Sequence, residues 1–348
     1  MQSDQVALQL YIFQKTVTML NSKFSRDVCH YAALVSALFA SAFIINNFLT
    51  YIFALPGLFG TLNSIGFSFD TAETSYHGFA IAIGVLQSLM YVGALVYPYL
   101  ILRRNGSAPR SSALMNNASI LVVSAAFWSV MFVGIVDAAI SFVRIESLLP
   151  SIVGEDLALS LGKPAFRGVY VHLPLILLGT MIAIKRRGFD FIWLASLIVF
   201  GELLIVITRF IFSYEQAFMG DLVRFWYAAL FLFASAYTLV HDGHVRVDVI
   251  YASFSDRAKA YTNILGSLML GLPLCWVVIT RGLWGPSSPF NLALLNFEVT
   301  QQGFGMYVKY LMSGFLIIFA ISMLFQFASL IIKELNTLED NPEANQPA

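Results

Sequence analysis

Eight apolar stretches, each about 20 residues long, constrain the fold of this sequence more than any other feature. A helix of that length crosses the hydrocarbon of a bilayer and satisfies its own backbone hydrogen bonds there, where no water can do so. The stretches run near 31–55, 78–102, 118–142, 168–185, 190–212, 221–241, 259–284 and 307–332. We therefore expect an all-α integral membrane protein with about eight transmembrane helices.

Composition supports lipid as the solvent of this chain. Of its residues, 58% are hydrophobic and 11% are charged, whereas a soluble domain carries about 25% charged residues. The 20 basic and 20 acidic residues balance and form no concentrated basic face, so nucleic acid is excluded as a partner. Cys29 and Cys275 lie far apart with no metal-site or disulfide spacing, and we expect them to be packing residues and the chain to need no cofactor.

Basic residues concentrate in alternate connectors, which predicts how the chain threads the membrane. They occupy the N-terminal arm and then Arg103, Arg104 and Arg110, Lys185 to Arg187, Arg246, Arg257 and Lys259, and Lys333. The connectors 56–77, 213–220 and 285–305 contain no Lys or Arg, and only 143–167 breaks the rule, with Arg144, Lys163 and Arg167. Because cytoplasmic loops retain positive charge, we expect both termini on the cytoplasmic side of the membrane.

The connector at 185–190 divides the chain into two four-helix halves. We expect an amphipathic interfacial arm at 1–28, a first membrane region at 29–187, a second at 188–334, and a disordered cytoplasmic tail at 335–348. A short echo between 168–172 and 305–309 leaves open whether the halves arose by duplication.

Two acidic residues stand out within the apolar stretches. Glu202 falls near the middle of 190–212, where a carboxylate is costly unless it is paired or protonated. Arg209 lies two turns further on, so the alternatives are a pair with Arg209, a polar contact on another helix or subunit, a protonated bystander, or a coupling-ion role. Asp137 and His172 approach the same predicted membrane face from consecutive helices, which suggests a buried pair.

Charged residues near the predicted helix ends are candidates for binding a partner chain. Asp221 and Arg224 are three residues apart on one helical face, where they can form a local ion pair or contact another subunit. His244, Arg246 and Asp248 alternate with valines, so an extended segment would place the three polar side chains on one side. They suit an interface with a partner or with lipid headgroups; the alternative is an ordinary loop.

The stretch from Arg224 to Lys259 resembles the DctQ-type small permease of tripartite ATP-independent periplasmic (TRAP) transporters. The resemblance rests on a helix ending in small residues, on HVRVD at 244–248, and on a Ser-Asp-Arg helix start at 255–257. Upstream, Arg209 with its aromatic neighbours is similar to the end of the family's first helix, and Asp221 with Arg224 to the start of the next. The similarity covers about 188–334, and the four preceding helices have no counterpart in the minimal family pattern.

This resemblance implies a scaffold subunit in the inner membrane of a bacterium that pairs with a large M-type elevator permease. No Gly-rich phosphate loop with Lys and no His-Glu-x-x-His run occurs in the sequence, so we do not expect an enzyme. The complex would take up an organic acid with an ion, typically sodium, and receive the solute from a periplasmic binding protein. The alternatives are an accessory membrane subunit of a respiratory or redox complex and a free-standing channel. A haem-binding redox subunit would need a pair of mid-membrane histidines on facing helices, and this sequence has none. A channel would need several helices lined with polar residues, and the sequence has only scattered ones.

Overall fold

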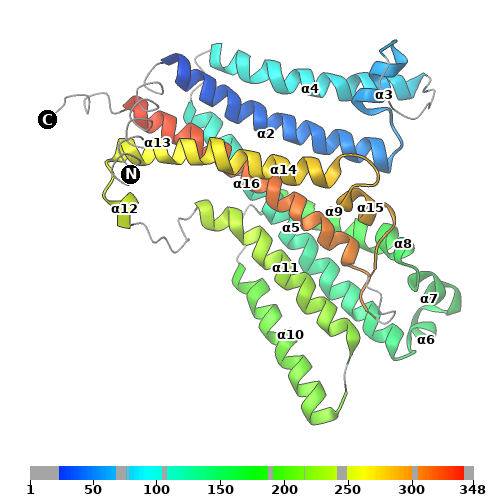
Figure 1. Cartoon of the computed structure of the whole chain (residues 1–348). Coiled ribbons are helices and arrows are strands. Elements are labelled where there is room, and N and C mark those ends of the chain that lie inside the picture. The colour runs from blue at the N-terminus through cyan, green and yellow to red at the C-terminus, as the bar shows by residue number, and fades with distance from the viewer. Residues whose placement is uncertain are drawn as a thin grey trace, which may run out of the picture. The chain divides into compact units, whose positions relative to one another are not determined.

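The computed structural model describes residues 23–67, 76, 78–103, 108–186, 191–214, 216–240, 249–299 and 305–340, and in these ranges it contains helices and no strands (Figure 1). In this part of the chain, 8 helical spans are long and apolar enough to cross a membrane: Lys23–Ile52, Phe79–Arg103, Pro109–Ile145, Pro164–Lys185, Phe191–Phe212, Phe218–Leu239, Asp256–Leu283 and Lys309–Glu339. The predicted all-α membrane fold is therefore confirmed. Most of the predicted arm and tail lies outside the described residues.

The spans are built from long helices with short ones between them. The long helices are α2 (Lys23–Ile52), α4 (Phe79–Arg103), α5 (Ala108–Ile145), α9 (Leu173–Lys185), α10 (Phe191–Phe212), α11 (Ala217–Val240), α13 (Asp256–Gly266), α14 (Leu272–Leu283) and α16 (Lys309–Asp340). The short ones are α3 (Gly57–Ser64), α6 (Leu149–Val153), α7 (Glu155–Leu161), α8 (Pro164–Arg167), α12 (Val249–Ala252) and α15 (Pro289–Leu295). The helix start expected at Ser-Asp-Arg 255–257 is present, and Ser255 caps it, because its Oγ accepts a hydrogen bond from Ala258 N at 3.3 Å.

Two spans contain a wide π turn directly before a proline. The segment η1 (Gly168–His172) precedes Pro174, and η2 (Ser267–Gly271) precedes Pro273. A proline inside a helix has no N–H for the carbonyl four residues earlier, and its ring clashes with that carbonyl. The wider turn relieves this conflict, so the two spans continue through their prolines.

The chain divides into two compact units, each assembled from separate segments. Unit 1 comprises Met1–Asn117, Val245–Trp276 and Leu324–Ala348, and unit 2 comprises Ala118–His244 and Val277–Met323. Both units draw on segments before and after residue 188, and α5, α14 and α16 each contribute to both. The division into 29–187 and 188–334 stays a prediction about the sequence.

Unit 1 is held together by contacts between membrane helices and between their polar ends. Side chains of α5 and α16 pair along their shared face, with Ser112 Oγ 3.0 Å from Ser329 Oγ and Gln326 Nε2 donating to Asn116 Oδ1 at 3.0 Å. Such small and polar residues allow close approach of membrane helices and link them. At the helix ends, Asn263 Nδ2 donates to Glu334 Oε1 at 2.8 Å, and this bond joins α13 to the end of α16.

Unit 2 has a core of aromatic and branched side chains from α5, α10, α11 and α16. The ring of Phe315 in α16 lies 5.2 Å from that of Phe225 and 5.0 Å from that of Phe233, both in α11. Gly134 in α5 lets the indole of Trp226 approach the helix backbone where a Cβ would collide with it. Within this unit α10 packs on α11 (Figure 1).

Three connectors of unit 2 meet at one end of its helices. Gln216 Nε2 donates to Glu146 Oε1 at 3.1 Å, and this bond joins the connector after α10 to the one after α5. Arg144 Nη2 donates to Gly305 O at 3.0 Å, which brings the connector before α16 to the same place. The connectors 143–167, 213–220 and 285–305 therefore share a side, as the charge pattern predicted.

Candidate functional site

Asp137 of α5 is the centre of a buried ionic network in unit 2, and its side chain has no exposed surface. Its Oδ1 accepts hydrogen bonds from Arg167 Nη1 at 2.8 Å and from the His172 ring at 3.1 Å. Its Oδ2 accepts one from Tyr307 N at 3.0 Å. A carboxylate inside a membrane protein needs such partners, because desolvation otherwise disfavours its charge strongly. The predicted pair of Asp137 and His172 is confirmed.

Arg167 provides the positive charge of this network. It ends α8 and is fully buried, and its guanidinium lies over the ring of Tyr307 at 4.3 Å. Besides Asp137, it donates from Nε to Leu161 O at 2.7 Å and from Nη1 to Ser141 Oγ at 3.0 Å. Within the described residues its Nη2 has no hydrogen-bond partner. The guanidinium thus joins α5 to the short helices that precede η1.

His172 links the carboxylate of Asp137 to the last membrane helix. Its Nδ1 lies 2.7 Å from the hydroxyl of Tyr310 in α16, and its Nε2 faces Asp137. A proton on Nε2 lets the ring donate to the carboxylate, so in the neutral tautomer Nδ1 accepts from the Tyr310 hydroxyl. Both ring nitrogens are then satisfied, and the orientation of the ring is fixed.

Two aspartates hold consecutive backbone N–H groups immediately before α16. Asp221 Oδ2 accepts from Met306 N at 3.2 Å, next to the bond between Asp137 and Tyr307 N. Negative charge is favourable at a helix N-terminus, where backbone N–H groups lack helical partners. The Tyr307 hydroxyl donates to Gly162 O at 2.9 Å and also bonds the guanidinium of Arg144. The start of α16 is therefore anchored to α5, to α11 and to the connector that contains Gly162.

This network explains the one exception in the charge pattern of the connectors. Arg144 and Arg167 break the rule for 143–167, but both are bound internally, and Arg167 is paired with a buried carboxylate. The guanidinium groups of both arginines are bound within unit 2, and of the three basic residues only Lys163 is exposed. Sequence reasoning missed Arg167 as a network member and assigned it to a surface loop. The sequence signal that could have identified Arg167 is a basic residue in a connector on the same predicted membrane side as Asp137 and His172, where the other connectors contain no Lys or Arg.

Asp221 and Arg224 form the predicted local ion pair, with 3.6 Å between Nη1 and Oδ1. The arginine side chain is 73% exposed, and such a pair contributes little to stability, at most about 1 kcal/mol. Asp221 is nearly buried because it also binds Met306 N. The structure thus gives the aspartate a structural role and leaves the arginine exposed.

Glu202 and Arg209 are both exposed on α10. Within the described residues no hydrogen bond or ion pair involves either side chain, so of the alternatives for Glu202 the pair with Arg209 does not form there. A charged side chain near the middle of a membrane helix that faces lipid costs about 2.5–3.5 kcal/mol. His244, Arg246 and Asp248 lie outside the described residues, and the structure says nothing of their interface role.

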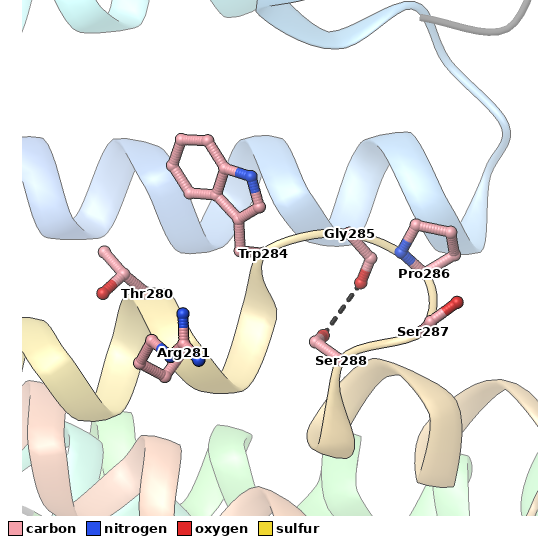
Figure 2. A pocket seen from close by; sticks show the side chains of 7 residues that line it. All are labelled: Thr280, Arg281, Trp284, Gly285, Pro286, Ser287 and Ser288. Carbon is pink, nitrogen blue, oxygen red and sulfur yellow. Dashed lines mark hydrogen bonds between the residues drawn. The ribbon is translucent and has the colours of Figure 1, made fainter.

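An open pocket with a volume of about 680 Å³ lies where α14 ends and the chain turns toward α15 (Figure 2). Its lining consists of Thr280, Arg281, Trp284, Gly285, Pro286, Ser287 and Ser288. Gly285 has a φ of 95°, and its carbonyl accepts a hydrogen bond from Ser288 Oγ at 2.8 Å. Arg281 and Trp284 suit contact with lipid headgroups, because they end a membrane span.

The contacts around Asp137 form a structural network that holds the helices of unit 2 together. No group of three His, Cys, Asp or Glu side chains that could hold a metal ion occurs among the described residues. All three hydrogen bonds to Asp137 come from groups of the same unit, so its carboxylate serves to join helices.

Comparison with protein families gives one match in the C-terminal part of the chain. Residues 197–336 match the family described as tripartite ATP-independent periplasmic transporters, DctQ component. Comparisons with curated proteins and with solved structures gave no match. The matched range extends from α10 to α16 and includes Asp221, Tyr307 and Tyr310. Residues 197–336 therefore form a DctQ component domain, and the chain, with 8 membrane-capable helical spans among its described residues, is a multi-pass inner-membrane protein.

Proposed function

We propose that this chain is the fixed scaffold of a TRAP transporter that takes up an organic acid with sodium ions. A large M-type permease would hold the solute and ion sites and move against this chain, and a periplasmic binding protein would deliver the solute. The DctQ match over 197–336 is the observation that carries the proposal.

A fixed role agrees with the way the last membrane helix is held. Asp137 and Asp221 bind the backbone before α16, and His172 binds Tyr310 within it. Buried networks whose members are satisfied make a helix arrangement rigid. A subunit against which another one moves requires such rigidity.

We further propose that the first four helices are an integral part of this scaffold. Asp137, Arg167 and His172 precede the DctQ match, and they bind Tyr307 and Tyr310 inside it. Removal of the first helices would leave α16 without these partners. The added region would thus brace the DctQ helices from the same side of the membrane on which the connectors meet.

The residues proposed to contact the permease outside the bilayer are His244, Arg246 and Asp248, with Arg224 as a further candidate. The first three belong to the connector between α11 and α13, which we place on the cytoplasmic side. Alanine substitutions of these three should lower the amount of bound permease or the rate of uptake and leave the choice of solute unchanged. A changed solute preference would contradict the scaffold role.

Co-purification tests the proposal directly. A tag on this chain should recover a large multi-helix permease from the native membrane, and the reconstituted complex with its binding protein should accumulate an organic acid when a sodium gradient is imposed. Recovery of the chain without a permease, or with a haem or flavin absorption spectrum, would contradict it.

A further inference from the structure

Helix α10 exposes most of its surface. Among the described residues it packs mainly on α11, and Phe191 at its start also meets Phe127 of α5. Its buried residues are Leu194 and Gly201. Large apolar side chains along it are exposed: Ile192, Trp193, Val199, Phe200, Leu203, Leu204, Val206, Phe210, Ile211 and Phe212. Such a helix faces either lipid or another membrane protein.

Glu202 distinguishes this surface from one that faces lipid. It lies 11 residues into a helix of 22, near the middle of the bilayer, and it is exposed. Arg209 is seven residues further along, which is roughly 10 Å of helix rise, and no ion pair joins the two in the described structure. A carboxylate at this depth requires a hydrogen-bond donor or a positive charge, and α10 and α11 supply none.

The exposed surface of α4 provides a comparison within the same chain. Leu86, Leu89, Val92 and Val96 are exposed along it, and before Arg103 the helix contains no charged residue. That surface suits lipid tails without any further partner. Near its middle, the surface of α10 thus differs from that of α4 in carrying an unpaired carboxylate.

We propose that the surface of α10 around Glu202 binds a membrane-spanning helix of the large permease, and that this helix presents a hydrogen-bond donor or a cation to the carboxylate. The proposal rests on the proposed function and adds to it the surface through which the two subunits meet. A second copy of this chain fits less well. Two copies inserted in the same orientation would bring Glu202 to the same depth in both, so like charges would face each other.

Site-specific photocrosslinking tests where the permease binds. A photoreactive phenylalanine replaces Val199 or Val206, which flank Glu202 on the same face, in the intact transporter in native membranes. Leu89 and Val92 of α4 receive the same replacement as matched controls. We expect adducts of this chain with the large permease from the two α10 positions and not from the α4 positions. Adducts with lipid alone, or with a second copy of this chain, would overturn the proposal.

Substitution of the carboxylate tests the chemistry of the contact. Glu202→Leu should lower the amount of permease recovered per small subunit by about tenfold, whereas Glu202→Gln, which still forms hydrogen bonds, should lower it less. The leucine variant should insert at the wild-type level and be as stable alone, because it removes a mid-membrane charge. Asp156→Asn, an exposed acid of α7, is the control.

The outcomes separate this inference from the proposed function. If wild-type protein and Glu202→Leu recover the same amount of permease, the contact at Glu202 is refuted and the transporter assignment stays intact. A wild-type chain that recovers no permease would refute the proposed function itself.

Discussion

Removal of the Asp137 charge should destabilise this protein more than removal of any exposed charge. In Asp137→Asn the amide has nearly the size of the carboxylate, so packing is preserved. Arg167, which is fully buried, then loses its counter-ion and keeps only neutral acceptors, Ser141 Oγ and Leu161 O. Breaking a buried ion pair by removing one partner costs about 3–5 kcal/mol, because the remaining charge is uncompensated. We therefore expect Asp137→Asn to lower the free energy of unfolding by about 3–5 kcal/mol.

The opposite substitution should be less damaging. In Arg167→Met, Asp137 keeps its hydrogen bonds to His172 and to Tyr307 N, so its carboxylate retains two donors. The double variant Asp137→Asn with Arg167→Met removes both charges. Its loss of unfolding free energy should therefore be about 1–3 kcal/mol smaller than the sum of the losses of the two single variants.

The assay is the free energy of unfolding in mixed micelles titrated with SDS, followed by the fluorescence of the 5 tryptophans. Arg281→Met serves as the matched control, because Arg281 is exposed in the same unit, and its loss should stay within about 0.5 kcal/mol. A loss below about 1 kcal/mol for Asp137→Asn, or single losses that simply add, would refute the reasoning that the network holds unit 2 together.

Three further predictions concern packing, capping and topology. Gly134→Ala should lower the free energy of unfolding by about 1–3 kcal/mol, because its Cβ would collide with the adjacent indole. Gly93 has open space around it, so Gly93→Ala should stabilise the protein by about 0.4–1 kcal/mol. SDS titration compares the two variants, and equal effects would contradict the close approach of the indole to Gly134. Ser255→Ala should cost about 1 kcal/mol in the same assay, and Ser255→Asp should preserve the cap; equal losses for both would show that the cap is unimportant. Single cysteines at Arg186 and Arg246, in a chain without its native cysteines, should react with an impermeant reagent only from the cytoplasmic side, and labelling from opposite sides would refute the threading.

Much of the fold follows from the sequence because it depends on local properties. The apolar length of each span, the polar cap at Ser255 and the spacing of Asp221 and Arg224 are read within a few residues, and the structure has each of them. The pair of Asp137 and His172 was also predictable, because consecutive helices must bring their ends to the same side of a bilayer.

The rest of the site depends on contacts between distant segments. Arg167 reads as a loop residue in the sequence, and only the folded chain places it on Asp137 and over the ring of Tyr307. The absence of a bond between Glu202 and Arg209 in the described structure was equally hidden, because helix spacing allowed their approach. Hydrophobicity thus determines which segments are able to cross the membrane, and the alternation of charge predicts how they thread it. The pairing of Arg167 with Asp137 was decided by tertiary structure alone, because it depends on side-chain directions that only packing fixes.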